Sequence, residues 1–303
     1  MGWEQALRLW RSPVAADSTS ARVAAERRAQ MSVVRAVSLC IASGKGGTGK
    51  SIVTASLADE FGARGRTLIV DADMGVGNAH ILQNTAPERS FVDVVAHRCS
   101  VAQARTVCTP TIDLVGGGSG VSQMSALNAR DVARIAHGLG EVESEYDYVL
   151  VDSAAGISDQ TVSFAAACDA VLIVTTPDVT AMTDAYAFIK VLHARRAELV
   201  PWLVVNRISS DDGPEHDAQH VSERISRVCE KFLALRPVML GAIPDDRAVP
   251  RSVAQRRSVV QAAPHSNAAA ALTALAREVA VRLSGVPRGG VGRRLARGLE
   301  AAE

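Results

Sequence analysis

A glycine-rich loop that follows a short apolar run is the feature that most restricts how this chain can fold. The run RAVSLCIA (35–42) leads directly into SGKGGTGKS, Ser43 to Ser51. Residues 44–51 fit the pattern G-x-x-x-x-G-K-[ST], in which glycines let the backbone turn tightly and point its N–H groups at phosphate oxygens. A helical pattern follows the loop, so the positive end of that helix is expected to face the same phosphates.

The loop predicts a site for a nucleoside triphosphate with Mg²⁺. Lys50 is expected to reach the β- and γ-phosphates, and the Ser51 hydroxyl is expected to bind Mg²⁺. Because phosphate oxygens in such loops are held by the backbone and by neighbouring hydroxyls, the remaining contacts are expected from Gly44, Gly46, Gly47, Thr48 and Gly49.

Further short apolar runs alternate with helical patterns along the chain. The runs are apolar on both faces, as strands of a buried parallel sheet are, and they lie at 67–73, 112–115, 146–152, 169–176, 201–207 and 237–244. We therefore predict an α/β fold: a doubly wound, mostly parallel sheet with helices on both faces. In such sheets ligands bind at the carboxyl ends of the strands. The polar residues at these ends include Asp71, Asp73, Asp152 and Asn206.

The composition argues against several other classes of protein. The formal net charge is +1, so the chain as a whole is not a polybasic binder of nucleic acid. Its five cysteines include no C-x-x-C pair, which argues against a disulfide framework and against a zinc or iron–sulfur site. No apolar run is long enough to span a bilayer, and the N-terminus lacks the apolar core of a signal peptide. We expect a cytoplasmic protein.

The loop contains a second lysine that a phosphate-binding loop does not need. With Lys45 early in the loop, the segment resembles the deviant Walker A motif, K-G-G-x-G-K-[ST], of the MinD/ParA family of dimeric ATPases. The resemblance runs from about residue 36 to 280. It implies ATP and Mg²⁺ as ligands, and an ATP-bound homodimer in which Lys45 reaches the partner's nucleotide. Two facing ATP molecules repel each other, and a cation between them offsets that repulsion.

The same resemblance implies roles for residues at the strand ends. DADMGVGN (71–78) resembles the first switch segment, in which Asp73 positions the attacking water and Asp71 lies near the metal. DSAAGIS (152–158) resembles the second switch, with Asp152 as the Walker B carboxylate. The resemblance thus implies a catalytic set of Lys45, Lys50 and Asp73, a metal set of Ser51, Asp71 and Asp152, and base contacts from Asn206, Pro244 and Asp245.

Some residues depart from the family pattern. Asp178 stands where the family usually has Glu, and His80 stands where N-x-Asp is common. Ala154 replaces a Gly or Pro, and Asn84 replaces a usual Gly. None of these changes removes an expected phosphate or metal ligand, so their effect is expected on the hydrolysis rate and on partner contacts.

One branch of the family fits several long segments. VGGGSGVSQMSAL (115–127), TTPDVTAMTDAYAFIK (175–190) and the segment 243–276 are similar to the FlhG branch, whose members are also called FleN or YlxH. This branch implies control of flagellar number or placement, with flagellar switch or regulatory proteins as partners. Two alternatives stay open: an ATP-bound scaffold with negligible turnover, and a DNA-partition ATPase of the ParA type, although DNA binding is not favoured.

The two ends predict separate roles. We divide the chain into a partner-binding segment with a linker (1–34), the ATPase domain (35–284) and a basic tail (285–303). EQALRL (4–9) resembles the FlhG segment that stimulates an FlhF-like SRP-type GTPase, and residues 1–12 carry an amphipathic stripe suited to such a contact. In the tail, Val291, Leu295 and Leu299 beside arginines have the spacing of a surface helix with a basic flank. A solvated tail is favoured, and weak affinity for the inner face of the cell membrane is the alternative.

Overall fold

A central sheet of eight strands organises the part of the chain that the structure describes. The structure is a computed structural model, and it describes residues 36–75, 77–118, 127–209 and 214–300. The strand order is β3-β4-β2-β5-β1-β6-β7-β8, and every neighbouring pair is parallel except β3 with β4. The strands are β1 (Val37–Ser43), β2 (Thr67–Ala72), β3 (Arg105–Thr109), β4 (Ile112–Val115), β5 (Tyr148–Ala155), β6 (Ala170–Thr175), β7 (Trp202–Ile208) and β8 (Val238–Pro244).

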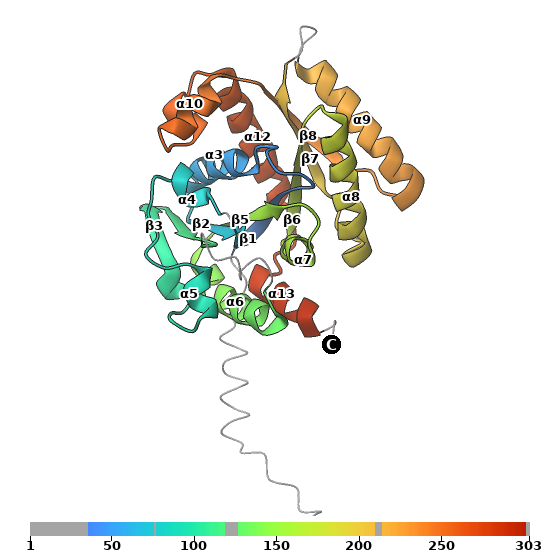
Figure 1. Cartoon of the computed structure of the whole chain (residues 1–303). Coiled ribbons are helices and arrows are strands. Elements are labelled where there is room, and N and C mark those ends of the chain that lie inside the picture. Colours follow the sequence, from blue (N-terminus) through green and yellow to red (C-terminus); the bar gives the residue numbers. More distant parts are fainter. Residues whose placement is uncertain (1–35, 76, 119–126, 210–213, 301–303) are drawn as a thin grey trace, which may run out of the picture. The chain divides into compact units, whose positions relative to one another are not determined.

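Helices cover both faces of the sheet (Figure 1). One apolar cluster joins α6, α7, α8, α9 and α13 to one face, and a second joins α3, α11 and α12 to the other. The described helices are α3 (Lys50–Gly62), α4 (Ala79–Leu82), α5 (Phe91–Val95), α6 (Ala129–Val142), α7 (Asp159–Ala167), α8 (Val179–Arg195), α9 (Pro214–Leu233), α10 (Ala248–Ala254), α11 (Val259–Ala262), α12 (Asn267–Ser284) and α13 (Val291–Glu300), with 3-10 turns at Ala102–Ala104 and Glu143–Glu145. The predicted doubly wound, mostly parallel α/β fold is confirmed.

The apolar runs became strands because they are buried on both faces. All residues of β1, β2 and β6 are buried, which is the environment that β-branched and aliphatic runs predict. The predicted pattern missed β3, an antiparallel edge strand. Its sequence, RTVCT, is only partly buried, and Val107 is 71% exposed. Three of its five residues are polar, so this edge strand carries no continuous apolar run that would reveal it.

The final helix packs into the domain. Val291 and Leu295 of α13 are buried in the cluster that contains α6 and α7. A Cβ added at Gly292 would come within 2.4 Å of the backbone of Ala136 and Gly140 in α6, so only glycine permits this approach of the two helices. The predicted helix is therefore present, but its first two apolar anchors pack inward and do not face solvent. No helix among the described residues is long and apolar enough to cross a membrane.

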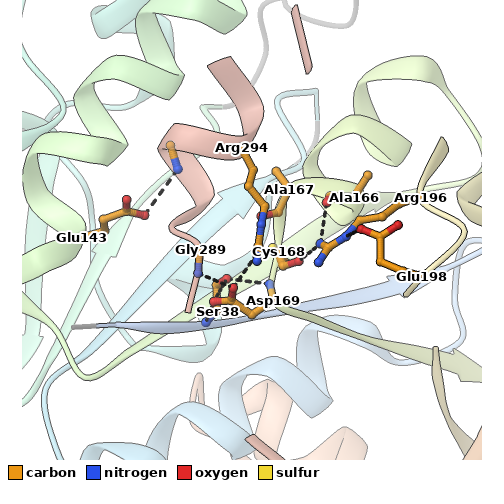
Figure 2. Close-up of polar contacts among 11 residues, drawn as sticks. Ser38, Glu143, Ala166, Ala167, Cys168, Asp169, Arg196, Glu198, Gly289 and Arg294 are labelled. Carbon is orange, nitrogen blue, oxygen red and sulfur yellow. Dashed lines mark hydrogen bonds and ion pairs between the residues drawn. The ribbon is translucent and has the colours of Figure 1, made fainter. Parts of the chain in front are cut away.

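Two buried carboxylates anchor the start of α13 (Figure 2). Asp169, just before β6, accepts hydrogen bonds from the backbone N–H of Gly289 at 2.8 Å and from the Ser38 N–H at 2.9 Å, and it forms an ion pair with Arg294. On the other side, Glu143 accepts a hydrogen bond from the N–H of Gly292 at 3.3 Å. Because both acids lie in the protein interior, each depends on these donors to offset its lost hydration.

The ion pair with Asp169 predicts a stability effect. Arg294→Ala should lower the free energy of unfolding by about 2 kcal/mol, because a fully buried carboxylate loses its cation. Arg297→Ala is the matched control, since Arg297 lies exposed on the same helix and should change stability by less than about 0.5 kcal/mol. Urea unfolding followed by circular dichroism measures both. Equal midpoints for the two variants would show that the pair does not hold α13.

Candidate functional site

The glycine loop lies between the end of β1 and the start of α3. Gly47 and Gly49 have φ values of +79° and +98°, which glycine adopts without strain. Gly44 lies so close to α8 that an added Cβ would be 2.0 Å from the carbonyl oxygen of Asp184. Lys50, the first residue of α3, is buried, and its Nζ donates a hydrogen bond to the Ser43 hydroxyl at 2.9 Å. The loop is therefore folded over its own lysine.

A side chain from β7 braces the loop. The Asn206 amide Nδ2 donates to the carbonyl oxygen of Thr48 at 2.7 Å, while its Oδ1 accepts from the Arg207 N–H at 2.9 Å. Within the described residues, the Thr48 hydroxyl is buried and has no hydrogen-bond partner. An unsatisfied hydroxyl in a loop of this shape fits a site whose natural occupant carries acceptor oxygens.

The expected acidic residues meet at the ends of two paired strands. Asp71 of β2 and Asp152 of β5 are partners in the parallel register, so they lie side by side. Asp71 accepts hydrogen bonds from the N–H groups of Asp73 at 3.1 Å and Ala79 at 3.2 Å. Asp152 accepts a hydrogen bond from the Thr54 hydroxyl at 3.1 Å. The register of the sheet thus brings together acids that are far apart in the sequence.

Burial sets the electrostatics of this cluster. It lowers the pKa of Lys50, an effect that the nearby charges of Asp152 and Asp73 oppose. Burial also raises the pKa of Asp71, and the charge of Asp152 raises it further. The pKa of Asp152 is likewise raised by burial, against hydrogen bonds from the hydroxyls of Ser51 and Thr54 and the charge of Lys50. A cation held next to these acids would favour their charged forms.

These residues fit a Mg²⁺–nucleotide. Ser51 lies beside Asp152, so the predicted metal set of Ser51, Asp71 and Asp152 is brought together. Among the described residues, no three acidic, histidine or cysteine side chains form a metal cage of their own. Mg²⁺ commonly keeps waters and binds through one or two carboxylates plus substrate phosphates, so a site of this kind would depend on the nucleotide.

Two cavities lie on either side of the loop. The first, of about 390 Å³, is lined by Gly46, Gly47, Thr48 and the rim residues Lys45, Thr176 and Asp178. The second, of about 430 Å³, is lined by Gly49, Asn206, Pro244 and Asp245 together with apolar residues such as Ile52, Val53 and Val249. The three residues expected at a base therefore share one largely apolar cavity, which suits a flat aromatic ring.

Arg207 lines both cavities and was not predicted from the sequence. Its φ of +57° lies in the left-handed region, which is uncommon for a residue other than glycine. It is also the exposed residue of β7. Its position directly after Asn206, at a strand end, could have identified Arg207 as a residue of the site. Nothing in the sequence indicated its backbone conformation.

The two lysines of the loop occupy different places. Lys50 is buried inside the loop, whereas the side chain of Lys45 is 42% exposed at the rim of the first cavity. The Nζ of Lys45 lies 2.7 Å from the Thr180 hydroxyl and 3.4 Å from the Asp178 carboxylate, both at the start of α8. The Ser43 hydroxyl therefore accepts from the Lys50 side chain, but it donates to the backbone carbonyl oxygen of Lys45, at 2.6 Å, while the Lys45 ammonium points to α8.

The departures from the family pattern have local explanations in two cases. Asn84 has a φ of +48°, a conformation that glycine adopts freely and that asparagine tolerates better than most residues. The pKa of His80 is lowered by partial burial and by the charge of Arg256, so its neutral form is favoured. Ala154 lies in the last part of β5, and nothing in the structure explains it.

Comparisons with known proteins agree with this geometry. The ParA sequence family described as "NUBPL iron-transfer P-loop NTPase" matches residues 34–280. Antiactivator FleN of Pseudomonas aeruginosa is 31% identical over 80% of this chain and 85% of its own length. Flagellum site-determining protein YlxH of Helicobacter pylori is 30% identical over 75% and 76%, respectively. The resemblance to the FlhG branch is thereby confirmed.

A solved structure supports the same relationship. The septum site-determining protein MinD of Pyrococcus horikoshii, complexed with Mg-ADP, matches with a TM-score of 0.68 at 25% identity. The match covers 82% of this chain and 98% of that one. The relative therefore carries the kind of ligand that the loop and its acidic neighbours fit.

The buried lysine predicts a loss of nucleotide binding. Lys50→Ala should weaken ATP binding by about 100-fold or more, because a charge-assisted contact to phosphate is lost from a dry site. Lys190→Ala, on the exposed side of α8, is the control and should bind as the wild type does. Isothermal titration with ATP and Mg²⁺ gives both affinities. A Lys50→Ala variant with wild-type affinity would show that the loop assignment is wrong.

Proposed function

Because the chain belongs to the ParA/MinD family of P-loop NTPases and is an ATPase, we propose that it is a switch in which ATP binding creates a symmetric dimer. Slow hydrolysis of ATP then ends the dimeric state. The observation that carries this proposal is the separation of the two loop lysines. Lys50 serves its own loop from within, while Lys45 stands at the exposed rim with a flexible stem.

The rim position suits contact with a second subunit. A lysine ammonium on a four-carbon stem can move several ångströms, and it is a compact charge that binds phosphate well. When two subunits face each other across their nucleotide sites, a cation from each one offsets the repulsion between the phosphates. Without nucleotide the same two cations repel. ATP binding and dimerisation are thereby linked into one event.

The chemistry assigned to the site is in-line attack of water on the γ-phosphoryl group. Asp73, partly buried beside Asp71, would orient the attacking water. Lys50, with Lys45 from the partner, would stabilise the charge on the transferred group. Ser51, Asp71 and Asp152 would hold Mg²⁺, which would supply further electrostatic stabilisation of the phosphates. Asn206, Pro244 and Asp245 would hold the base in the second cavity.

The output that we propose is control of flagellar number or placement. The support comes from the names of the two relatives, an antiactivator and a flagellum site-determining protein, at 31% and 30% identity. The proposed partner is an SRP-type GTPase of the FlhF type, bound through residues 1–12, which lie outside the described residues. We place the protein in the cytoplasm. Membrane contact through α13 would first require Val291 and Leu295 to leave their packed positions.

Two alternatives have their own tests. A scaffold with negligible turnover would bind ATP and dimerise but release no phosphate, so phosphate release by the purified protein separates it from the switch. A DNA-partition ATPase would bind nonspecific DNA in ATP, with a strong dependence on salt. Arg195 pairs with Asp159, and Arg196 donates to the carbonyl oxygens of Ala166 and Cys168. These neighbouring arginines, which are of the type that contacts a DNA backbone, thus already have partners within the chain.

The proposed roles of Lys45 and Asp73 predict different defects. Lys45→Ala should lose ATP-driven dimerisation and turnover but keep nucleotide binding, because it acts on the partner's site. Asp73→Ala should keep ATP and the dimer, and it should slow phosphate release by about 100-fold or more, because it only orients water. Light scattering with ATP and a phosphate-release assay measure the pair. If the Lys45→Ala variant formed a dimer as tight as that of the wild type, Lys45 would have no role in the partner's nucleotide site.

Residues 1–12 generate a second prediction. Removal of these residues should leave ATP binding and dimerisation unchanged but abolish stimulation of an FlhF-like GTPase, because buried aromatic anchors commonly contribute about 2 kcal/mol or more to an interface. Gln5→Ala alone should weaken the stimulation, since a Gln amide can orient a water or a catalytic group in the partner's site. GTP turnover by the partner is the measurement. Equal stimulation by full-length protein, truncation and point variant would mean that the EQALRL match is coincidental.

A further inference from the structure

The last strand of the sheet, β8, has a neighbour on one side only. It pairs with β7, and within the residues that the structure describes no strand pairs with its other edge. The N–H of Val238, at the start of β8, donates to the carbonyl oxygen of Pro201, the residue before β7, at 3.1 Å. A strand with one partner presents a second row of N–H and C=O groups on its free edge. This row can form hydrogen bonds with an additional chain.

A groove of about 590 Å³ lies along this free edge. Met239 packs against the apolar cluster on one face of the sheet and Leu240 against the cluster on the other, yet both line the groove, so it lies at the edge and not on one face. α9 contributes one wall with Ala218, and α12 contributes the other with Ala271 and Ala274. We call this cavity the β8 groove. Its small wall residues leave room for the side chains of another chain.

The edge of β8 is recessed between the two helices. None of its seven residues is exposed: Ile243 is buried and the other six are half-buried. A second copy of this chain could pair with β8 only if the two strands came within about 4.8 Å, the spacing of paired strands. That copy would bring its own α9 and α12, and these would meet the first pair of helices before the strands met. A single extended segment has no such flanking helices, so it fits the groove better than another sheet does.

Protection against unwanted pairing explains only part of this edge. Natural edges are commonly guarded by prolines, bulges, charged residues or a covering element. Pro237 and Pro244 bound β8, and its register with β7 shifts near Gly241. However, the strand itself, VMLGAIP, carries no charge, and α9 and α12 leave a cavity between them. The prolines and the bulge are therefore accounted for, whereas the groove is not.

Among the described residues that line the groove, the single charged one is an acid, Glu278. Early in α12, the N–H of Ala268 donates to the carboxylate of Asp246, just after β8, at 3.1 Å. Further along α12, Leu275 lies opposite Gly241, 3.7 Å from a Cβ added there. α12 therefore runs antiparallel to β8, which places Glu278 near the amino end of the strand. Glu278 pairs with an arginine one turn later, but a carboxylate has acceptor sites for a second cation as well.

We propose that the β8 groove binds an extended segment of a partner protein, which adds a strand to the sheet. Backbone hydrogen bonds to the free edge of β8 hold the segment, and its alternate aliphatic side chains fill the space beside the alanines of α9 and α12. A basic residue of the segment contacts Glu278, so the charges of the two surfaces are complementary. This interaction surface goes beyond the proposed ATP-driven switch and does not depend on it.

A strand-forming peptide tests the backbone contacts. The probe is a short fluorescent peptide in which valine alternates with serine, with a lysine at each end so that either direction of docking brings one near Glu278. We expect saturable binding to the nucleotide-free full chain, measured by fluorescence anisotropy. The same peptide with methylated backbone nitrogens should bind at least about 10-fold more weakly, because it cannot donate hydrogen bonds to β8. No binding at millimolar peptide, or equal binding of the two peptides, would overturn the proposal.

Two tryptophan variants locate the binding. Ala274→Trp places an indole in the groove and should weaken peptide binding by about 10-fold or more. Ala270→Trp is the matched control, since Ala270 is exposed on the same helix but does not line the groove, and it should change the affinity by less than about 2-fold. Both alanines are exposed, so both variants should fold, and circular dichroism checks this. Equal affinities of the two variants would place the peptide elsewhere and contradict the proposal.

The charge of the occupant has its own test. Glu278→Gln keeps an acceptor and removes the charge, so it should weaken binding of the lysine-flanked peptide by about 2- to 5-fold at low salt. An unchanged affinity would show that the occupant needs no basic residue.

Other occupants would give different results. A second copy in the groove would appear as a nucleotide-free dimer in analytical ultracentrifugation that Ala274→Trp abolishes and Ala270→Trp retains. A helical occupant would appear as an amphipathic helical peptide that displaces the strand peptide and binds more tightly than it does. Either result would overturn the added strand. A failure of ATP-driven dimerisation, by contrast, would contradict the proposed switch and leave the peptide result unchanged.

Discussion

The close approach of two acids and one lysine at the ends of neighbouring parallel strands is the constraint on which the site depends. Asp71 and Asp152 lie side by side because β2 and β5 pair in register, and Lys50 opens α3 after the loop that follows β1, the strand on the other side of β5. Burial penalises all three charges, so each needs the others or a ligand. The sheet therefore brings together charged groups that burial penalises. A divalent cation bound there with an anionic ligand would offset that penalty.

The two lysines of the glycine loop lie in different environments. Lys50 is shielded within the loop and has little freedom to leave it, whereas Lys45 is exposed and held only by surface contacts. Asp178, which contacts the Lys45 side chain, is itself fixed by three donors, the hydroxyls of Thr176 and Thr180 and the N–H of Ala181.

The sequence allowed the sheet and the loop to be predicted because their signals are local. Buried parallel strands are short apolar runs, and the loop is a continuous motif. The edge strand β3 was missed because RTVCT contains no continuous apolar run. In α9, Val228 and Phe232 lie at helical spacing, yet they are 38% and 64% exposed. Periodicity identifies the apolar face of a helix, but it does not show how much of the length of that face is covered by packed elements.

Contacts between distant segments were the least accessible to sequence analysis. The predicted base residues Asn206, Pro244 and Asp245 do share a cavity. The hydrogen bond from the Asn206 amide to the Thr48 carbonyl oxygen, however, could not be predicted, because no sequence pattern near either residue indicates it. The same holds for α13. An amphipathic stripe indicates that one face of a helix will be covered, and here α6 and α7 cover it. The approach of α13 to α6 requires Gly292, because a Cβ added there would lie 2.3 Å from the backbone N of Gly140.

The anchoring of α13 makes residues 289–294 necessary for the satisfaction of two buried acids in the rest of the domain. Asp169 and Glu143 lie at the ends of elements built from the middle of the sequence, but their donors come from residues 289–294. A premature stop codon after α12 would leave every strand and every expected nucleotide ligand encoded, while two interior acids lost donors on which they depend. We expect such a gene product to be handled by the cell's proteases as a damaged protein.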